Sequence, residues 1–153
     1  MPLAFHSPAP AAWLLDPGLE ADPDSELGSD QCLIRGEEFY IRGLIQLPVR
    51  DDERVFEWGV WVSLSRENFI HSGHLWNTAG RESAEPMFGW LSTALPTYHP
   101  ATLSLKTMVH TREVGLRPLV VLEPTDHPLA VEQRDGITVD VLEKRASQLL
   151  HPA

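Results

Sequence analysis

Apolar residues alternate with other residues over a ten-residue stretch of the chain, FEWGVWVSLS at positions 56–65. The residues of one parity are all apolar: Phe56, Trp58, Val60, Val62 and Leu64. Because successive side chains of a strand point to opposite faces, this period predicts a strand with one face against a core. The other face carries Trp61 beside Gly59, whose missing side chain leaves room for another group to approach the backbone.

Four further segments are predicted as strands. They are residues 31–35, 38–48, 102–110 and 117–123. Only Gly36 and Glu37 separate the first two, which predicts a tight hairpin. Residues 87–91 fit either a strand or one turn of helix.

Capping residues predict three helices. Ser65 is expected to cap a short helix over 66–76. Pro128 is expected to begin a second short helix that Gly136 closes, and Thr138 to cap a C-terminal helix with an apolar stripe. Strands grouped together with helices between and after them predict an α+β fold. We expect a mainly antiparallel sheet of about five strands, a short helix after the third strand and a C-terminal helix.

The first 29 residues are rich in proline, which fixes φ and favours extended or irregular backbone. We therefore predict an irregular N-terminal arm over 1–29 that packs on the rest of the chain through Phe5, Trp13, Leu14 and Leu15. Residues 30–153 are expected to form a single α+β domain, since a chain of 153 residues is of ordinary one-domain size.

The composition is that of a folded, acidic protein. The apolar fraction is 42% and the net charge is −10, which excludes disorder for most of the chain and disfavours nucleic acid and anionic membranes as partners. The charge either serves solubility or attracts a basic partner. No segment reaches the roughly 18 apolar residues of a membrane helix, and no signal peptide is visible at the N-terminus. A cytoplasmic location is therefore predicted.

Metal and thiol chemistry find little support in the residues. The single cysteine, Cys32, cannot form a disulfide within the chain or a structural zinc site by itself, and it is interpreted as a buried apolar side chain rather than a reactive thiol. His71 and His74 lie three positions apart, on one side of a helix, but no third ligand accompanies them. We expect no metal site and no cofactor.

The order and content of several motifs resemble the bacterial domain-of-unknown-function family 2199. The motifs are WGVWVSLS (58–65), FGWL (88–91), PTY (96–98) and EPTDHPLAVEQRDGIT (123–138). The resemblance covers nearly all of residues 3–150 and implies a bacterial protein, with no established activity to carry over. Many members begin with a Cys-x-x-Cys-Gly segment suggestive of a zinc knuckle. This chain begins MPLAF and has no cysteine before Cys32, so a metal-dependent role of that segment is not expected here.

The candidate catalytic residues are His127, Asp126 and Glu123, in a run that leaves a strand and enters a helix. A carboxylate next to an imidazole orients and polarises it as a general base. The alternative is structural: Thr125 or Asp126 caps the helix, and His127 bonds to a backbone group.

The candidate binding residues are Trp61, Trp90, Tyr98 and His99, which either line a stacking surface or belong to the core. Three functions follow as hypotheses: a non-catalytic module that binds a protein or a small ligand, a small hydrolase centred on His127, and an acidic immunity-type inhibitor of a basic toxin. We expect neither nucleic acid nor a membrane as a partner, and a homodimer is left open.

Overall fold

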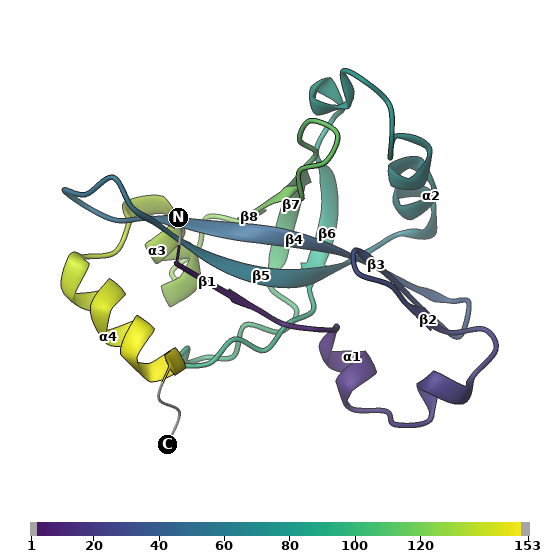
Figure 1. Cartoon of the computed structure of the whole chain (residues 1–153), viewed down its shortest axis with the longest axis horizontal. Helices are drawn as coiled ribbons and strands as arrows, with labels where there is room; N and C mark the ends of the chain where they lie inside the picture. Colours follow the sequence, from purple (N-terminus) through teal and green to yellow (C-terminus); the bar gives the residue numbers. More distant parts are fainter. Residues whose placement is uncertain (1–2, 151–153) are drawn as a thin grey trace.

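The computed structural model describes residues 3–150 of the chain, and Figure 1 shows the arrangement of its elements. The strands are β1 (Leu3–His6), β2 (Glu26–Leu27), β3 (Gln31–Ile34), β4 (Glu38–Pro48), β5 (Val55–Leu64), β6 (Met87–Leu91), β7 (Lys106–His110) and β8 (Leu119–Leu122). The helices are α1 (Ala11–Leu14), α2 (Arg66–His74), α3 (Pro128–Asp135) and α4 (Val139–Leu150), with 3-10 turns η1 (Leu19–Ala21) and η2 (Arg81–Ser83).

Five strands close into a barrel in the order β4-β5-β6-β7-β8, with β8 returning to β4. Four of the five pairings are antiparallel. The closing pairing is parallel and short: Leu44 pairs with Leu119, and the Leu44 N–H donates to the Pro118 carbonyl at 2.9 Å. Gly43 permits this approach, because a Cβ at that position would lie 2.7 Å from a methyl group of Val120.

The α+β class is confirmed, as are the short helix after the third predicted strand and the C-terminal helix. The expected sheet of about five strands is wrong: the sheet has eight strands and includes a closed barrel. Two of the additional strands, β1 and β2, lie in the arm that proline content predicted to be irregular. Residues 87–91 form strand β6. Residues 1–2 and 151–153, at the ends of the predicted ranges, lie outside the described residues.

The predicted parity of β5 is confirmed. Its five apolar residues of one parity all belong to the main core: Phe56, Trp58, Val60, Val62 and Leu64. The antiparallel register places Ile41, Ile45 and Leu47 of β4 on the same face, opposite residues of that set. Alternation along two long neighbouring strands therefore builds one wall of the barrel interior.

Four predicted helix boundaries are also confirmed, whereas the helix predicted over 66–76 ends earlier, at His74. The Ser65 hydroxyl accepts a hydrogen bond from the Asn68 N–H at 3.1 Å, and the Thr138 hydroxyl accepts one from the Val141 N–H at 3.2 Å. Pro128 is the first residue of α3, and Gly136 ends that helix at φ +82°, in the left-handed region that glycine enters without steric cost.

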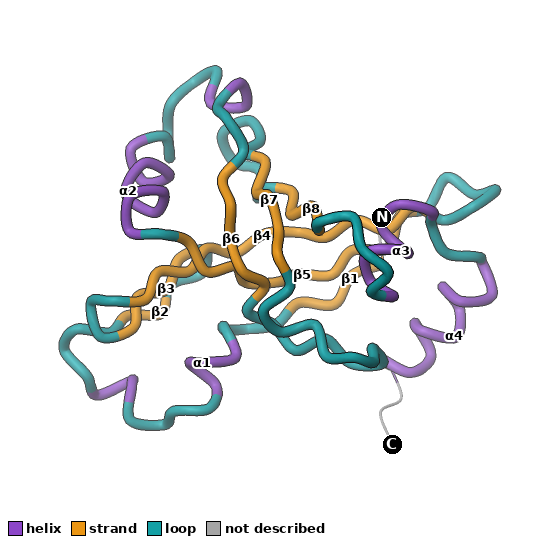
Figure 2. Tube along the Cα trace, turned by 180° about the vertical axis from the view of Figure 1, so that it is seen from behind, coloured by secondary structure: helices purple, strands orange, loops and turns teal. Residues whose placement is uncertain are grey.

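The N-terminal arm covers the outer face of β3, β4 and β5. Trp61 lies there, fully buried in a second apolar cluster with Leu19 of the arm and with Cys32, Ile34 and Tyr40. Strand β1 runs parallel to the first half of β5, and both views show the two side by side (Figures 1 and 2). The group that approaches the backbone of Gly59 is His6 of β1, since a Cβ on Gly59 would lie 2.1 Å from the His6 ring.

Helices α3 and α4 lie together at one end of the long β4–β5 pair, and α2 lies toward the other end (Figure 1). A buried polar chain connects α3 and α4 with the core. The Trp58 indole N–H donates to the Tyr98 hydroxyl at 2.9 Å, and that hydroxyl donates to Glu132 at 2.5 Å. Arg145 donates two hydrogen bonds to the Glu132 carboxylate, at 3.0 and 3.1 Å.

Candidate functional site

A cavity of about 500 Å³ lies between α2, the outer side of β4 and the loop at 111–118. Its apolar lining includes Ile41, Leu44, Leu75, Trp76, Met87 and Leu116. Four arginines also line it: Arg42, Arg81, Arg112 and Arg117. Small-molecule sites in proteins have volumes of roughly 300–1,000 Å³ and combine apolar walls with a few polar groups. This cavity has both properties.

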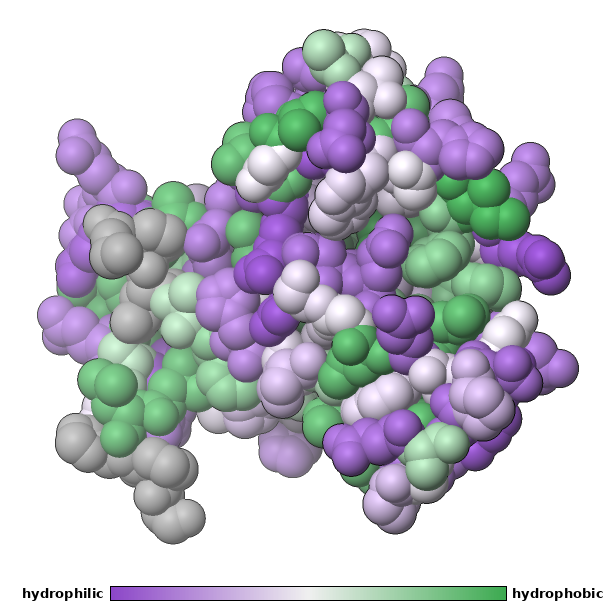
Figure 3. Space-filling model, turned by 45° about the vertical axis from the view of Figure 1, so that its right-hand side comes forward, coloured by the Kyte–Doolittle hydropathy of each residue, from purple (hydrophilic) through white to green (hydrophobic). Residues whose placement is uncertain are grey.

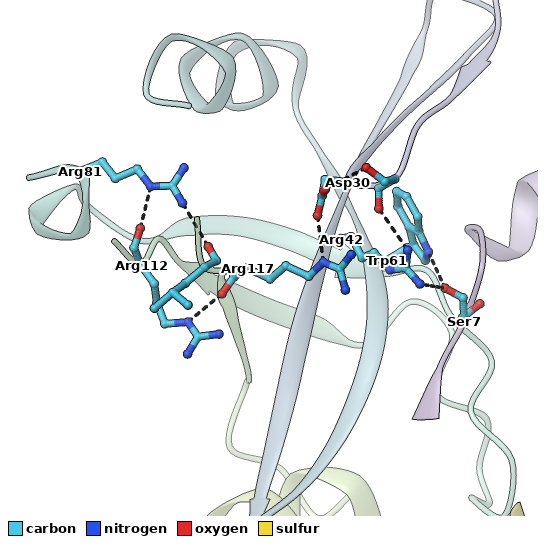
Figure 4. A network of polar contacts seen from close by, with 9 residues as sticks. Ser7, Asp30, Arg42, Trp61, Arg81, Arg112 and Arg117 are labelled. Carbon is cyan, nitrogen blue, oxygen red and sulfur yellow. Dashed lines mark hydrogen bonds and ion pairs between the residues drawn. The ribbon is translucent and has the colours of Figure 1, made fainter. Parts of the chain in front are cut away.

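Three of the arginines form a chain of hydrogen bonds along the cavity wall (Figure 4). Arg81 Nε donates to the Arg112 carbonyl at 2.7 Å, and Arg112 Nε donates to the Arg117 carbonyl at 2.7 Å. Arg117 Nε then donates to the Asp30 carboxylate at 2.9 Å. The chain joins η2, the 111–118 loop and the turn before β3, so each element fixes the position of the next.

Arg81 is the structural anchor of this wall. Besides its bond to Arg112, its terminal nitrogens donate to the carbonyls of Trp76, Glu113 and Leu116. Only 8% of the residue is exposed. Its donors are therefore committed to holding the loop and the segment after α2 in place.

Arg42 anchors the N-terminal arm from the other side of the cavity. Its terminal nitrogens donate to the carbonyls of Ser29 at 3.1 Å and Ser7 at 2.9 Å. The Trp61 indole donates to the same Ser7 carbonyl at 3.1 Å, and the Arg42 guanidinium lies 5.4 Å from the Trp61 ring (Figure 4). Arg42 Nε is buried and has no partner among the described residues.

Two groups that line the cavity have lowered pKa values, to which neighbouring positive charge contributes after burial. Burial lowers the pKa of Arg42, and the neighbouring charge of Arg117 lowers it further against the opposing effect of Asp30. The pKa of His6 falls below its usual 6.5, first through burial and then through the charges of Arg42 and Arg117, while Glu57 opposes the shift. The positive charges of Arg42 and Arg117 therefore lie close enough to influence each other, and the nearby carboxylates of Asp30 and Glu57 offset them only in part.

His6 is therefore expected to titrate below pH 6.5 in an NMR titration of its ring, and replacing Arg117 with glutamine is expected to move the midpoint upward. The pKa is lower in the folded than in the unfolded state, so the unfolded chain binds the proton first. The contribution of His6 to stability is then present above pH 6.5 and is lost as the pH falls through the folded pKa. An unchanged midpoint in the Arg117 variant would refute the charge coupling.

The four predicted binding residues do not share one surface. Trp61 is fully buried under the arm, and Tyr98 is 6% exposed in the main core. Trp90 is 44% exposed on β6, and His99 is exposed in the loop between β6 and β7. Trp61 and Tyr98 are not accessible because the arm covers the first and the buried polar chain with Glu132 holds the second.

Trp90 belongs to an exposed apolar row on the outside of the barrel. Phe88 lies 5.1 Å from it, edge to face, and Lys106 lies over its ring. Met108 and Val121 continue the row across β7 and β8, where the register pairs Phe88 with Met108 and Met108 with Val121. On the face of the molecule drawn in Figure 3, apolar and hydrophilic side chains are interspersed.

His127 is the N-cap of α3. Its Nδ1 accepts a hydrogen bond from the Leu129 N–H at 3.1 Å, and its Nε2 lies 2.8 Å from the Pro100 carbonyl oxygen. Both contacts require a neutral ring with its proton on Nε2. Asp126 and Glu123 are exposed, and neither makes a hydrogen bond to the ring within the described chain. The arrangement leaves no ring nitrogen free to accept a substrate proton.

Replacing His127 with glutamine is expected to reduce the free energy of unfolding by roughly 0.5–2 kcal/mol, the range of a lost cap or a single hydrogen bond. The variant should remain folded, and urea denaturation measures the difference. A variant with wild-type stability would show that the cap contributes nothing.

The remaining candidates lie apart from the cavity or at its edge. Cys32 is 1% exposed, and burial together with Glu38 raises its pKa to about 11, which makes the thiolate scarce at neutral pH. His71 and His74 lie exposed in the last turn of α2. Within residues 3–150, no three His, Cys, Asp or Glu side chains gather closely enough to hold a metal ion.

The chain is an α+β protein with a small closed barrel and an arginine-lined cavity on its outer side. Residues 1–137 match the model of a family described as "Uncharacterized protein conserved in bacteria (DUF2199)", and the chain belongs to that family. No curated protein and no solved structure matches the chain significantly. Among the described residues, no helix has the length and apolar character needed to cross a membrane.

Proposed function

We propose that this protein is a non-catalytic binding module that holds a small ligand in the cavity beside α2. The supporting observation is the cavity itself, about 500 Å³ in volume, with an apolar lining and an arginine wall whose position is fixed by hydrogen bonds. A rigid, largely pre-formed pocket reduces the entropy lost on binding.

The other two hypotheses receive less support from the same residues. An enzyme centred on His127 requires a free ring nitrogen, and both nitrogens contact backbone groups. An inhibitor of a basic toxin requires an acidic docking surface, whereas the cavity beside α2 carries four arginines.

A thermal-shift screen with a library of neutral, cationic and anionic compounds tests the proposal. A ligand that binds only the folded state raises the unfolding free energy by about 2.7 kcal/mol at a concentration of 100 Kd. Replacing Ser72, a cavity-lining residue of α2, with tryptophan should fill the cavity and abolish the stabilisation.

Glu67→Trp is the matched control, because Glu67 is exposed on the same helix and does not line the cavity. Compounds that stabilise wild type should stabilise this variant equally. Equal binding by Ser72→Trp, or the absence of any stabilising compound, would contradict the proposal.

A further inference from the structure

The cavity concentrates positive charge in a strongly acidic protein. The chain has 12 basic and 22 acidic residues, for a net charge of −10. Four of the basic residues line this one cavity against a single carboxylate, that of Asp30. The lining therefore carries a formal charge of +3, from four arginines and one aspartate, when His6 is neutral. Such local reversal of the overall charge attracts anions.

Most of this charge is not neutralised by ion pairs. Within residues 3–150, Arg42 and Arg81 donate only to backbone carbonyls, which carry no formal charge. Among the described residues, only Arg117 of the four pairs with a carboxylate. Elsewhere on the chain, Arg35, Arg54, Arg134 and Arg145 each have an acidic partner. In the part of the chain that the structure describes, Arg50 and Arg66 also have no carboxylate partner, so the cavity is distinguished by the number of arginines that it brings together.

Two arginines retain unused donors. Arg112 and Arg117 each use Nε, for the Arg117 carbonyl and for Asp30 respectively. Their terminal Nη groups have no hydrogen-bond partner within residues 3–150. Because a guanidinium presents its N–H groups as a planar fork, it matches the paired oxygens of a carboxylate or a phosphate.

We infer that the ligand of the proposed binding function is an organic oxyanion, whose carboxylate or phosphate group binds the free Nη groups of Arg117 and whose apolar body lies against Trp76 and Leu116. This inference rests on the proposed function and specifies its ligand class. An inorganic ion would fill only a small part of a cavity of about 500 Å³. Trp76 and Leu116 are 43% and 46% exposed and offer an apolar surface to a larger molecule.

Asp30 sets the affinity of this site. Its carboxylate already occupies the Nε edge of Arg117 at 2.9 Å, at the border of the cavity. An incoming anion therefore meets one negative charge beside the donors that it needs. Replacing Asp30 with asparagine removes that charge and keeps an acceptor oxygen, so anions should bind the variant more tightly.

Isothermal titration calorimetry with phenyl phosphate, phenylacetate, benzyl alcohol and inorganic phosphate tests the inference. We expect at least one of the two aromatic anions to bind, and both benzyl alcohol and inorganic phosphate to bind at least tenfold more weakly. Arg117→Gln should weaken binding of the aromatic anion at least tenfold, whereas Asp30→Asn should tighten it. Comparison of the two aromatic anions distinguishes a phosphate site from a carboxylate site.

Arg134→Gln is the matched control, because Arg134 pairs with Asp135 and does not line the cavity. Its binding should equal that of wild type. If a glutamine variant fails to fold, Arg117→Lys replaces it: the charge remains while the planar fork is lost, and binding should still weaken.

The outcomes separate this inference from the proposed function. Suppose that a neutral compound from the screen binds wild type and Arg117→Gln equally but does not bind Ser72→Trp. That result would overturn the inference that the ligand is an oxyanion, and the proposal of a binding module would stand. The oxyanion inference would also be overturned if such a neutral compound bound and neither aromatic anion did. A complete absence of binding by every probe and library compound would overturn both.

Discussion

Replacing Trp58 with alanine is expected to reduce the free energy of unfolding by about 3–5 kcal/mol, enough to unfold a marginal domain. Trp58 is fully buried. Phe5, Phe56 and Tyr98 all meet its ring edge to face, at centroid distances of 5.5, 4.7 and 5.9 Å. Alanine would leave a large cavity at this junction, and the Tyr98 hydroxyl would lose its indole donor.

The same substitution at Trp90 is the control, because that ring is 44% exposed on the outside of the barrel. Trp90→Ala should change stability by no more than about 0.5 kcal/mol, as surface substitutions usually do. Urea denaturation of both variants makes the comparison. A Trp58 variant with the wild-type midpoint would mean that the two faces of β5 have been assigned the wrong way round.

Replacing Glu132 with alanine is expected to destabilise the protein by about 3–5 kcal/mol, the usual result of breaking a buried ion pair from one side. Arg145, 8% exposed, would lose its carboxylate partner and keep its charge among the rings of Phe56, Trp58 and Tyr98. The Tyr98 hydroxyl would lose its acceptor as well.

The double substitution Glu132→Leu with Arg145→Met separates the cost of an unpaired charge from the value of the pair. Apolar residues of similar volume replace buried ion pairs at little cost, so the double variant should be more stable than Glu132→Ala. A double variant less stable than Glu132→Ala would show that the pair itself contributes most of the stability. Thermal unfolding of the three proteins decides between these results.

Local sequence patterns predicted the elements that short-range physics determines. The parity of residues 56–64 identified the core face of β5, and Ser65, Pro128, Gly136 and Thr138 marked helix ends that the structure confirms. Each of these signals acts within a few residues of the chain, where periodicity and capping have direct energetic consequences.

Local patterns could not predict the pairings between strands that lie far apart in the sequence. The barrel closes through one short contact between Leu44 and Leu119, and β1 pairs with a strand about fifty residues away in the sequence. Proline content predicted an irregular arm, but pairing with β5 stabilises β1 as a strand. The pattern left open whether Trp61 lines a stacking surface or belongs to the core, because its burial depends on the arm that covers that face.

The cavity could not be predicted because its arginines form no sequence motif. Arg42, Arg81, Arg112 and Arg117 come from β4, η2 and the 111–118 loop, and only the tertiary fold brings them together. One signal was present: Arg42 is the only charged residue among positions 39–49, and the other charged residue of that strand is its first, Glu38. A charge at that position indicates a specific partner or ligand.

The most direct test of the ligand site follows the indole N–H signals of the five tryptophans in a ¹H–¹⁵N spectrum during separate titrations with phenyl phosphate and phenylacetate. Trp76 lines the cavity and Trp90 lies on the outer apolar row, and Trp76→Phe and Trp90→Phe assign the two signals. If the cavity is the ligand site, at least one of the two anions moves the Trp76 signal with saturation while the Trp90 signal stays in place. Movement of the Trp90 signal with an unchanged Trp76 signal would contradict it and place the binding surface on the outside of the barrel.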